Sequence, residues 1–399
     1  MNITISPRQL SGQVQIIPSK SQAHRLLICA AFADQQTTLL CPQTSKDIAA
    51  TAACLEALGA KIIRTDRGYH VTPIAVVPQT ALLPCGESGS TLRFLLPIVG
   101  ALGVDAIFEM EGRLPQRPLS PLWEEMVRMG CRLEWINASQ LRCSGKLSAG
   151  EYRIDGNISS QFITGLLFAT SLMDGDSWIA ILGTLESSGS VDLTLQAMKR
   201  FRIKTADLCM VGPQTYRSPG QITVEGDWSN GAFWLVAQAL GNPVDVAGLD
   251  EKSAQGDRAI VSILQKLLKS KRTICVADIP DLVPILAVAA CALKGATFTG
   301  IRRLRLKESD RVASTVSLIN SLGGHAEATE DTLTVHPGTF LGGTVDACSD
   351  HRIAMAAAIA ATICTQPVTI LGAQCVEKSY PGFWEEYQLL GGQYAECLQ

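Results

Sequence analysis

The chain has 399 residues, of which 47% are hydrophobic, so it can bury more than one core, and two domains of about 200 residues are expected. Its formal net charge of −3, with no stripe of basic residues, argues against nucleic acid as a partner. Its thirteen cysteines lack Cys-x-x-Cys spacing, which is typical of buried thiols in a reducing compartment and argues against a structural zinc site.

The N-terminus lacks the basic and long apolar segments of a secretion signal, and we expect a cytoplasmic protein. Residues 353–376 carry no charge and resemble a membrane span in composition. Thr365-Gln366-Pro367 breaks this stretch into a helix of about 13 residues and a strand, both too short for a bilayer. We therefore expect a buried helix here and no membrane contact.

The first distinctive stretch is Pro18-Ser-Lys-Ser-Gln-Ala-His-Arg25, between a predicted strand at 13–17 and an apolar run at 26–33. A helix that starts here with Ser21 as its cap places Arg25 one turn later on the same face. Lys20 and Arg25 then stand at a helix N-terminus, where the macrodipole disfavours cations. Free amides, a hydroxyl and two cations suit a phosphate or carboxylate, and a capped helix with solvated basic side chains is the simpler alternative.

The same order of strand, polar turn and apolar helix recurs at a spacing of about 70 residues, with one shorter step of about 50. The six polar turns are residues 18–25, 86–93, 156–162, 225–231, 278–282 and 349–354. A second, more amphipathic helix follows each turn, at 47–58, 119–129, 191–201, 257–268, 310–322 and 383–390, usually with a glycine C-cap. Six units of alternating strands and helices predict an α/β protein.

Charged side chains gather in these turns and in three further segments. Residues 111–118 hold two arginines in a loop stiffened by proline, and residues 303–311 alternate like a strand before a helix capped by Ser309 or Asp310. The third segment is 377–381, Glu-Lys-Ser-Tyr-Pro. If the repeats bring these segments together, one cleft holds about eight cations and few acids, which suits substrates with several phosphate and carboxylate groups.

These residues also have plain structural interpretations. Three fit ordinary surface or ion-paired arginines: Arg113, Arg303 and Arg305. Lys307-Glu308 fits a solvated strand end. Asp281, beside an apolar run, fits either a helix N-cap or a carboxylate that transfers protons. His351 fits a buried histidine whose hydrogen bonds are satisfied.

Together the motifs resemble the 5-enolpyruvylshikimate-3-phosphate synthases, a family of enolpyruvyl transferases. The residues that carry the resemblance are Pro18-Ser-Lys-Ser21, Arg25, Gly86 to Arg93, Arg117-Pro118, Ser159-Ser160-Gln161, Val224-Glu-Gly-Asp227, Pro280-Asp281, Lys307-Glu-Ser-Asp-Arg311, Asp350-His-Arg352 and Lys378-Ser-Tyr-Pro381. They follow one another in the family's order, and several are long enough to be specific.

The resemblance implies a two-domain enolpyruvyl transferase fold, an inside-out α/β barrel of six βαβαββ repeats with three repeats in each domain. Residues 1–17 and 227–399 would form one discontinuous domain, and residues 18–226 the domain inserted into it. The active site is expected in the cleft between the two domains. The resemblance also suggests a monomer whose partners are its small-molecule substrates.

The reaction implied is transfer of the enolpyruvyl group of phosphoenolpyruvate to the 5-hydroxyl of shikimate 3-phosphate with release of phosphate, in the shikimate pathway to chorismate and the aromatic amino acids. Asp281 is expected to be the base and Glu308 the proton donor, with Lys20 as a third catalytic residue. Shikimate 3-phosphate would be held by Lys20, Ser21, Arg25, Ser159, Ser160, Gln161, Ser187, Asp281 and Lys307. Phosphoenolpyruvate would be held by Lys20, Gly89, Arg117, Gln161, Arg311, Arg352 and Lys378. The resemblance implies no metal and no organic cofactor.

Three places depart from the family's usual pattern. Glu87 puts a carboxylate beside the turn expected to bind phosphoenolpyruvate, which would weaken binding unless it pairs with Arg93 or Arg117. Residues 188–190, Ser-Gly-Ser, lack a cation and an aromatic on the shikimate side. Arg303 stands where many members have asparagine. These departures concern affinity, and they leave the expected fold unchanged.

Two alternatives stay open. The related enzyme that transfers enolpyruvyl to UDP-N-acetylglucosamine shares the repeat fold, but it carries a cysteine shortly before the Arg-Pro of its mobile loop, and residues 111–116 contain none. The other alternative is a non-catalytic relative that binds phosphorylated metabolites. The altered residues 188–190 favour it, and the retention of Asp281 and Glu308 argues against it.

Overall fold

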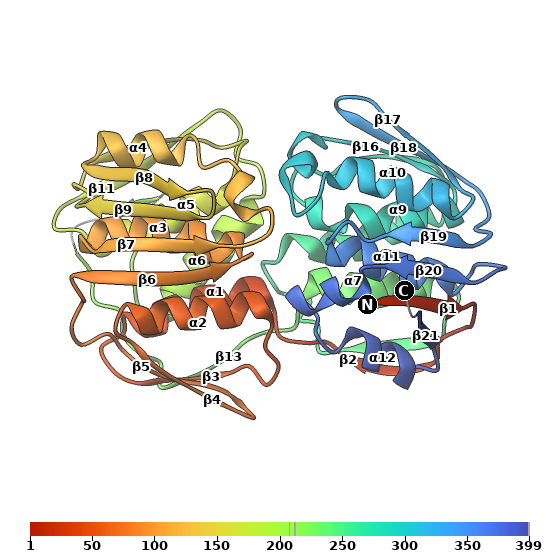
Figure 1. Cartoon of the computed structure of the whole chain (residues 1–399), viewed down its shortest axis with the longest axis horizontal. Coiled ribbons are helices and arrows are strands. Elements are labelled where there is room, and N and C mark those ends of the chain that lie inside the picture. Colours follow the sequence, from red (N-terminus) through yellow and green to blue (C-terminus); the bar gives the residue numbers. More distant parts are fainter. Residues whose placement is uncertain (207, 211–212, 398–399) are drawn as a thin grey trace. The chain divides into compact units, whose positions relative to one another are not determined.

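The computed structural model describes residues 1–206, 208–210 and 213–397, which form a mixed α/β structure (Figure 1). The chain divides into two compact units. We call the first the split unit, because it comprises Met1–Ile17 and Gly226–Gln399, and the second, Pro18–Glu225, the continuous unit. The continuous unit runs from orange to yellow-green in Figure 1, and most of the split unit runs from green to blue.

The described residues of the continuous unit contain two four-stranded sheets of one design and a smaller sheet. In each larger sheet a parallel pair of strands is followed by two antiparallel neighbours. The first contains β13 (Gln221–Thr223), β3 (Thr37–Leu40), β5 (Gly68–Thr72) and β4 (Lys61–Thr65), and the second β6 (Thr80–Gly86), β7 (Asp105–Met110), β9 (Gln140–Gly145) and β8 (Cys131–Asn137). The smaller sheet contains β10 (Glu151–Asp155), β11 (Ser177–Leu182) and β12 (Cys209–Met210).

The split unit repeats this design in the part of the chain that the structure describes. One four-stranded sheet contains β15 (Arg272–Cys275), β16 (Ala296–Thr299), β18 (Thr332–His336) and β17 (His325–Ala328), in that order. The other contains β19 (Gly343–Asp346), β20 (Val368–Leu371), β1 (Asn2–Ser6) and β21 (Gln393–Cys397). The pair β14 (Val244–Ala247) and β2 (Gly12–Gln15) is parallel.

In each unit three helices are buried over almost their whole length, and beyond their first two turns their sequences are apolar on nearly every side. They are α1 (Lys20–Ala31), α3 (Gly89–Leu102) and α5 (Ser160–Thr170) in the continuous unit, and α7 (Trp228–Ala239), α9 (Val283–Ala292) and α11 (His351–Ala361) in the split unit. The remaining helices are α2 (Lys46–Ala57), α4 (Leu122–Arg128), α6 (Ser188–Arg200), α8 (Ile260–Leu267), α10 (Arg311–Ser321) and α12 (Phe383–Leu389). Short 3₁₀ helices are η1 (Leu114–Gln116), η2 (Gly256–Ala259), η3 (Pro280–Leu282), η4 (Arg302–Leu306) and η5 (Ala373–Lys378).

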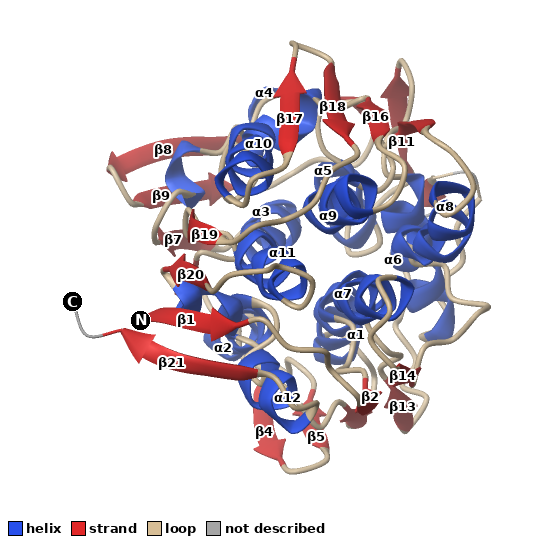
Figure 2. Ribbon diagram, turned by 90° about the vertical axis from the view of Figure 1, so that its right-hand side faces the viewer, coloured by secondary structure: helices blue, strands red, loops and turns tan. Residues whose placement is uncertain are grey.

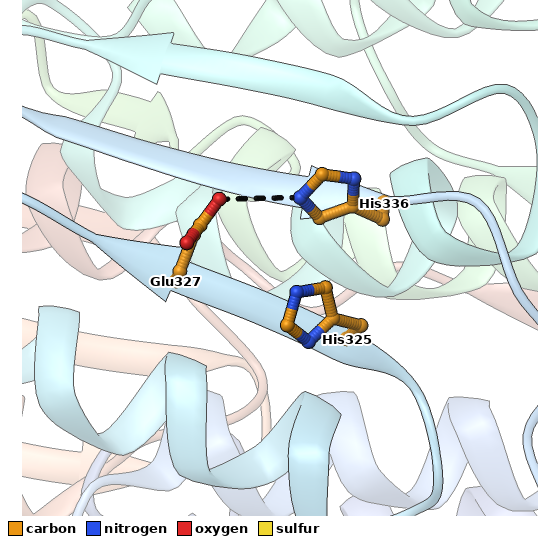
Figure 3. Close-up of side chains that lie close together, drawn as sticks. All are labelled: His325, Glu327 and His336. Atoms are coloured by element: carbon orange, nitrogen blue, oxygen red, sulfur yellow. Dashed lines mark hydrogen bonds and ion pairs between the residues drawn. The ribbon is translucent and has the colours of Figure 1, made fainter.

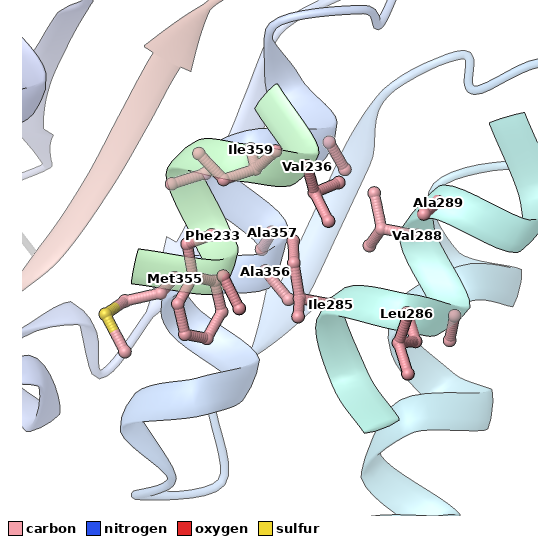
Figure 4. Close-up of a cluster of buried hydrophobic side chains, with 14 of the residues drawn as sticks. Phe233, Val236, Ile285, Leu286, Val288, Ala289, Met355, Ala356, Ala357 and Ile359 are labelled. Atoms are coloured by element: carbon pink, nitrogen blue, oxygen red, sulfur yellow. The ribbon is translucent and has the colours of Figure 1, made fainter. Parts of the chain in front are cut away.

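The core of the split unit forms where α7, α9 and α11 pack against one another, and Figure 2 shows these helices end-on. Figure 4 shows Phe233 of α7 and Ile285 and Val288 of α9 beside Ala356 and Ala357 of α11. Small side chains on α11 allow the larger ones of its neighbours to fill the space between the helices. This packing holds the three helices, and with them their N-termini, in fixed positions relative to one another.

The continuous unit has a core of its own, in which α3 and α5 approach closely. At Gly165 of α5 a β-carbon would collide with the backbone oxygen of Arg93 and lie 3.0 Å from Cγ of Pro97. Glycine is required here because the two backbones leave no room for a side chain. The close approach brings the first turns of α3 and α5 next to each other.

The α/β class is confirmed, and the six expected amphipathic helices occur within a few residues of their predicted positions. The prediction that the segment from residue 303 forms a strand is wrong, because residues 302–306 form the 3₁₀ helix η4. Asp310, and not Ser309, caps the helix that follows. The uncharged stretch from residue 353 ends its helix at Ala361, and no helix among the described residues has the length and apolar character that a membrane crossing needs.

Candidate active site

Helix α1 is capped by Ser19, whose side chain accepts a hydrogen bond from the backbone N–H of Gln22. The expectation that Ser21 caps this helix is therefore wrong, because the helix starts at Lys20. Ser21 lies in the first turn with an exposed side chain, which leaves its hydroxyl accessible. Lys20 and Ser21 both remain at the N-terminus of α1, as predicted.

Asp47, in the first turn of α2, holds Lys20. The Lys20 Nζ lies 3.1 Å from Asp47 Oδ2, and the two side chains are 16% and 9% exposed. An acid at a helix N-terminus interacts favourably with the macrodipole, so Asp47 stabilises α2 as well as the cation. Asp47 was not among the predicted site residues, because it is 27 positions away from Lys20 in sequence.

Arg25 is buried and joins α1 to α5 and α6. Its Nε donates to Thr194 Oγ1 at 2.8 Å, and its Nη2 donates to the backbone oxygen and hydroxyl of Ser190 at 2.9 and 2.8 Å. Its Nη1 donates to the carbonyl of Ser21, one helical turn earlier. Ser190 belongs to the segment that departs from the family's pattern, so in this chain the segment serves to orient Arg25.

The first turns of α3 and α5 are joined by Gln161. Its Oε1 accepts from Arg93 Nη1 at 2.8 Å, and its Nε2 donates to Ser90 Oγ at 3.0 Å. These bonds fix which way the side-chain amide points. Ser159 caps α5 and Ser160 is its first residue, so both hydroxyls lie at the same helix N-terminus as Gln161.

Gly89 lets Arg117 lie directly over the first turn of α3. A β-carbon at Gly89 would be only 2.6 Å from Arg117 Nη1 and 3.2 Å from Cζ. The guanidinium therefore adds a cation to the free amides of that turn, a combination that favours an anion. Glu87 lies against Gly112, in the loop that leads to Arg117, and its pairing with Arg93 or Arg117 stays a prediction.

Ser187 precedes α6 in a left-handed conformation, with φ at 57°. A residue other than glycine rarely adopts this conformation, and such positions are frequent at functional sites. The neighbouring Glu186 donates its backbone N–H to the carbonyl of Gly156, in the turn that leads to Ser159. The structure thus places the Ser187 segment beside the turn before α5.

In the split unit, Asp281 belongs to η3, just before α9, and its carboxylate lies among three cations. Its carboxylate is 2.7 Å from Arg311 Nη1, 3.3 Å from Arg352 Nη2 and 3.6 Å from Lys307 Nζ. Burial alone would raise the pKa of Asp281, but these cations together hold it well below its usual value. Asp281 is therefore ionised, and its side chain is still 37% exposed, so it remains accessible.

Arg311 connects Asp281 to two further carboxylates. Its Nη2 lies 2.6 Å from Glu308 Oε2, and its Nε lies 2.9 Å from Asp350 Oδ2. Asp350 is fully buried, caps α11 and also accepts from the hydroxyl of Ser309. It was not among the predicted site residues, yet it holds both the guanidinium of Arg311 and the first turn of α11.

Lys307 is the third cation at Asp281. Burial is the main cause that lowers its pKa, to about 8, with Arg303 and Arg311 acting in the same direction and Asp281 opposing them. This explains how Arg303, the unusual residue at its position, acts on the site: it is a positive neighbour of Lys307. Lys307 is thus a cation whose charge depends on pH near neutrality.

Arg352, in the first turn of α11, has unused donors. Its backbone N–H and Nη2 have partners in Asp350 and Asp281, but within the described residues its buried Nε and Nη1 have no hydrogen-bond partner. A buried donor without a partner lowers the stability of the fold by about 1–3 kcal/mol, so such groups usually bind a ligand or water. Unused N–H groups of a guanidinium bind carboxylates and phosphates through charge-assisted hydrogen bonds.

Asp257 in η2 is a carboxyl group that the sequence did not single out for chemistry. Burial is the largest cause that raises its pKa to about 6, and the negative charge of Asp281 adds to it, while Arg352 opposes both. Perturbed carboxyls of this kind cluster at functional sites. Asp257 therefore extends the group of charges around Asp281.

Lys378 lies at the end of η5, next to Ser379. The hydroxyl of Ser379 accepts a hydrogen bond of 3.4 Å from Asn230 in the first turn of α7. The structure thus connects this segment with the start of α7, and it places the predicted residues Asp281, Lys307, Glu308, Arg311 and Arg352 together. A cluster of several cations and carboxylates can bind an anion and exchange protons with it.

Comparisons with known proteins agree on one family. Residues 5–387 match the family model described as EPSP synthase (3-phosphoshikimate 1-carboxyvinyltransferase). A 3-phosphoshikimate 1-carboxyvinyltransferase of Clostridium kluyveri is 40% identical over 99% of this chain and 98% of its own, and one of Clostridium beijerinckii is 38% identical over the same shares.

Solved structures share the fold at lower sequence identity. An EPSP synthase from Acinetobacter baumannii superposes with a TM-score of 0.80 at 21% identity, covering 99% of this chain and all of its own. The enolpyruvyl transferase NikO from Streptomyces tendae gives a TM-score of 0.76 at 16% identity, covering 99% and 98%. At these identities the likeness concerns the fold.

Proposed function

This chain belongs to the EPSP synthase family, and on that premise we propose that it transfers the enolpyruvyl group of phosphoenolpyruvate to the 5-hydroxyl of shikimate 3-phosphate and releases phosphate. The reaction needs a proton for the methylene carbon of phosphoenolpyruvate and a base for the attacking hydroxyl. It also needs cations for two phosphates and two carboxylates. The alternative of a non-catalytic relative is disfavoured, because relatives that match 99% of the chain are named as enzymes.

The observation that carries the proposal is the pair of unused donors on Arg352. Both are buried and both belong to a guanidinium whose Nη2 is bonded to Asp281, so an anion that binds either of them lies near that carboxylate. Phosphoenolpyruvate supplies such an anion in its carboxylate or its phosphate. Arg311 and Lys378 are proposed to assist in holding phosphoenolpyruvate, and so are Lys20, Gly89, Arg117 and Gln161 of the continuous unit.

Asp281 is the proposed base. In the free protein its pKa is held well below the usual range, so it is ionised but weakly basic. An anionic substrate that pairs with Arg352 and Lys307 neutralises part of the positive charge around Asp281. The pKa of Asp281 then rises, which strengthens the base when the substrate is bound. Glu308, bonded to Arg311 on the other side, is the proposed proton donor.

The continuous unit is proposed to bind shikimate 3-phosphate through Lys20, the exposed hydroxyl of Ser21 and the first turn of α5. Asp47 keeps Lys20 in place, and Ser190 and Thr194 keep Arg25 in place, so these cations need little reorganisation when the anion arrives. The other residues proposed for this substrate are Ser159, Ser160, Gln161, Ser187, Asp281 and Lys307. The reaction therefore requires residues of both units to act on the same pair of substrates.

The family also suggests finer features, which we include in the proposal. The two units would each contain three βαβαββ repeats, in an inside-out α/β barrel, and the expected cleft between domains stays a prediction. The protein would act as a monomer in the cytoplasm. The shared order of the four-stranded sheets supports the repeats, because each pairs two parallel strands before two antiparallel ones.

The test is phosphate release by the purified protein from phosphoenolpyruvate, with shikimate 3-phosphate or with UDP-N-acetylglucosamine as the second substrate. We expect release only with shikimate 3-phosphate.

We expect Arg352→Gln to weaken phosphoenolpyruvate binding by about tenfold or more, because a buried charge-assisted pair is lost. Arg302→Gln, at an exposed arginine, is the matched control.

Release only with UDP-N-acetylglucosamine would show that the chain has the activity of the other enolpyruvyl transferase. A folded protein that binds shikimate 3-phosphate but releases no phosphate would instead support a non-catalytic role. Equal binding of phosphoenolpyruvate by Arg352→Gln and the unchanged protein would show that the unused donors do not form the anion site.

A further inference from the structure

Two of the five histidines in the chain face each other across one rung of the β17–β18 ladder. His325 pairs with His336 in register, and their ring centroids are 4.7 Å apart. Glu327 lies two residues after His325, on the same face of β17, and its Oε1 is 3.3 Å from His336 Nε2. Figure 3 shows the three side chains on neighbouring strands, with Glu327 reaching toward His336.

The strand that carries two of these side chains is fixed from its other side. Ala326, between His325 and Glu327, is buried, so its neighbours point away from the core. Asn320 of α10 accepts from the backbone N–H of Ala326 at 2.7 Å and donates to its carbonyl at 3.0 Å. The edge strand β17 is therefore held in one register, and the outward direction of both side chains is determined by the backbone.

We propose that His325, His336 and Glu327 form a site for a divalent transition-metal ion of the zinc class. The ligand atoms available on these residues lie within 4.8 Å of one another. In a tetrahedral site with metal–nitrogen bonds of about 2.0–2.1 Å, ligand atoms are about 3.3 Å apart. The side chains of His336 and Glu327 are 39% and 66% exposed, so rotation of their outer bonds can close this gap.

The donor set determines the class of ion. Two imidazoles and one carboxylate suit zinc, cobalt, nickel or copper, whereas magnesium and calcium prefer oxygen ligands alone. Three protein ligands leave a fourth position for water. Imidazole binds a metal through a ring nitrogen that carries no proton. The bound ion would connect the edge strand β17 to β18, and so stabilise the split unit.

The site is separate from the proposed reaction. None of its three residues is among those assigned to either substrate. Cysteine spacing, on which the expectation about zinc rested, does not report on a site made of histidines. The pairing of the two histidines depends on the β-ladder, since they are 11 positions apart in sequence and face each other only when β17 and β18 form a hairpin.

The experiment is titration of the full chain, expressed without a histidine tag and freed of metal, with Co²⁺ and Zn²⁺ at about pH 7.5. We expect one equivalent of Co²⁺ to give visible absorption bands, and Zn²⁺ to displace it. His325→Gln and His336→Gln should each weaken binding by about tenfold or more, because each removes one of three ligands. His70→Gln, at a histidine bonded to Thr38 on another sheet, is the control and should bind as the unchanged protein does.

A second readout distinguishes a specific site from loose surface binding. Zn²⁺ should raise the unfolding midpoint of the unchanged protein and of His70→Gln, and not that of the double variant His325→Gln/His336→Gln. The proposal would be overturned if all three proteins bound Co²⁺ with equal affinity and Zn²⁺ shifted their unfolding midpoints equally. So would the absence of Co²⁺ bands at millimolar ion, which would leave His336 and Glu327 as a hydrogen-bonded pair only. Phosphate release in the presence of a chelator should be unchanged, so failure of this proposal leaves the proposed reaction unaffected.

Discussion

The carboxylate of Asp281 contacts the cations of the site and is still accessible, so its substitution should affect substrate binding and turnover differently. We expect Asp281→Asn to lower turnover by about a hundredfold or more, in line with loss of a general base. Binding of phosphoenolpyruvate should not weaken, because the substitution removes a negative charge that competes for Arg352. Steady-state phosphate release and equilibrium binding measure the two effects.

Asp331→Asn is the matched control for this substitution, because it removes a carboxylate from an exposed pair with Arg302 in the same unit. It should leave both measurements unchanged. The structure rules out the helix N-cap as an alternative role for Asp281, because Leu282 precedes α9 and no side chain caps that helix. Turnover of Asp281→Asn close to that of the unchanged protein would therefore show that Asp281 serves only to pair with the cations around it.

Lys307 predicts a pH dependence of binding. With its pKa lowered to about 8 by burial, it is largely protonated at pH 7 and loses its charge as the pH rises past that value. A bound phosphate favours the charged form and raises this pKa. We therefore expect shikimate 3-phosphate to bind more weakly above about pH 8, and binding near pH 8.5 to take up protons.

Calorimetry in two buffers with different ionisation enthalpies measures this uptake. Lys307→Gln should bind shikimate 3-phosphate more weakly at pH 7 and should take up fewer protons near pH 8.5. The idea fails if proton uptake is the same in the unchanged protein and the variant, because another group would then be the one that titrates.

The start of α11 is an element whose order depends on one buried carboxylate. Asp350 caps the helix and pairs with Arg311, and both side chains are almost completely buried. We expect Asp350→Asn to lower the free energy of unfolding by about 3 kcal/mol or more, because it leaves a buried guanidinium with one partner fewer. Asparagine caps helices well, so the loss reports the charge and not the cap. Denaturant unfolding measures the change.

Asp310→Asn provides the comparison, since Asp310 also caps a helix but its side chain is 43% exposed. Its free energy of unfolding should change by less than about 1 kcal/mol. Equal losses in the two variants would mean that burial of the pair at Asp350 contributes nothing beyond capping.

Element positions could be predicted well, because the signals are local. Gly59, for example, follows α2 with φ at +107°, as a C-capping glycine should. The segment 303–307 failed for an equally local reason: Leu304 and Leu306 alternate as in a strand, but only Leu304 is buried. Ser19 and Ser21 are both good caps by type, and residue type alone could not decide between them.

The site could be predicted only in part, because its supporting residues come from distant positions. The motifs gave Arg311 and Asp281, which the structure brings within 2.7 Å. The carboxylates that hold the cations, Asp47 for Lys20 and Asp350 for Arg311, are 27 and 39 positions away from their partners. No spacing rule for helices or strands reaches that far.

At the scale of the whole molecule, the ends of the continuous unit meet. The backbone N–H of Ser19 donates to the carbonyl of Glu225 at 2.7 Å, and the unit has a hydrophobic core of its own. We expect residues 18–225, expressed alone, to fold and to unfold in one cooperative transition. They should release no phosphate, because Asp281 and Glu308 belong to the split unit. Circular dichroism during denaturant titration measures the folding.

A shorter fragment, 18–206, tests whether the last part of the unit matters. It lacks β12, the buried Tyr216 and β13, the parallel neighbour of β3, and so it should unfold at lower denaturant concentration or with less cooperativity. A fragment 18–225 that showed no cooperative transition would mean that the continuous unit needs the split unit in order to fold.

The position of β1 has a consequence for synthesis in the cell. This strand is made long before its two neighbours in the sheet, β20 and β21. At translation rates of about 5–20 residues per second, β1 emerges from the ribosome roughly 20 to 80 seconds before its sheet can close. The continuous unit, complete by residue 225, can fold during that interval. A ribosome that stalls late therefore leaves one finished unit attached to an unpaired strand with exposed isoleucines, a target for chaperones and proteases.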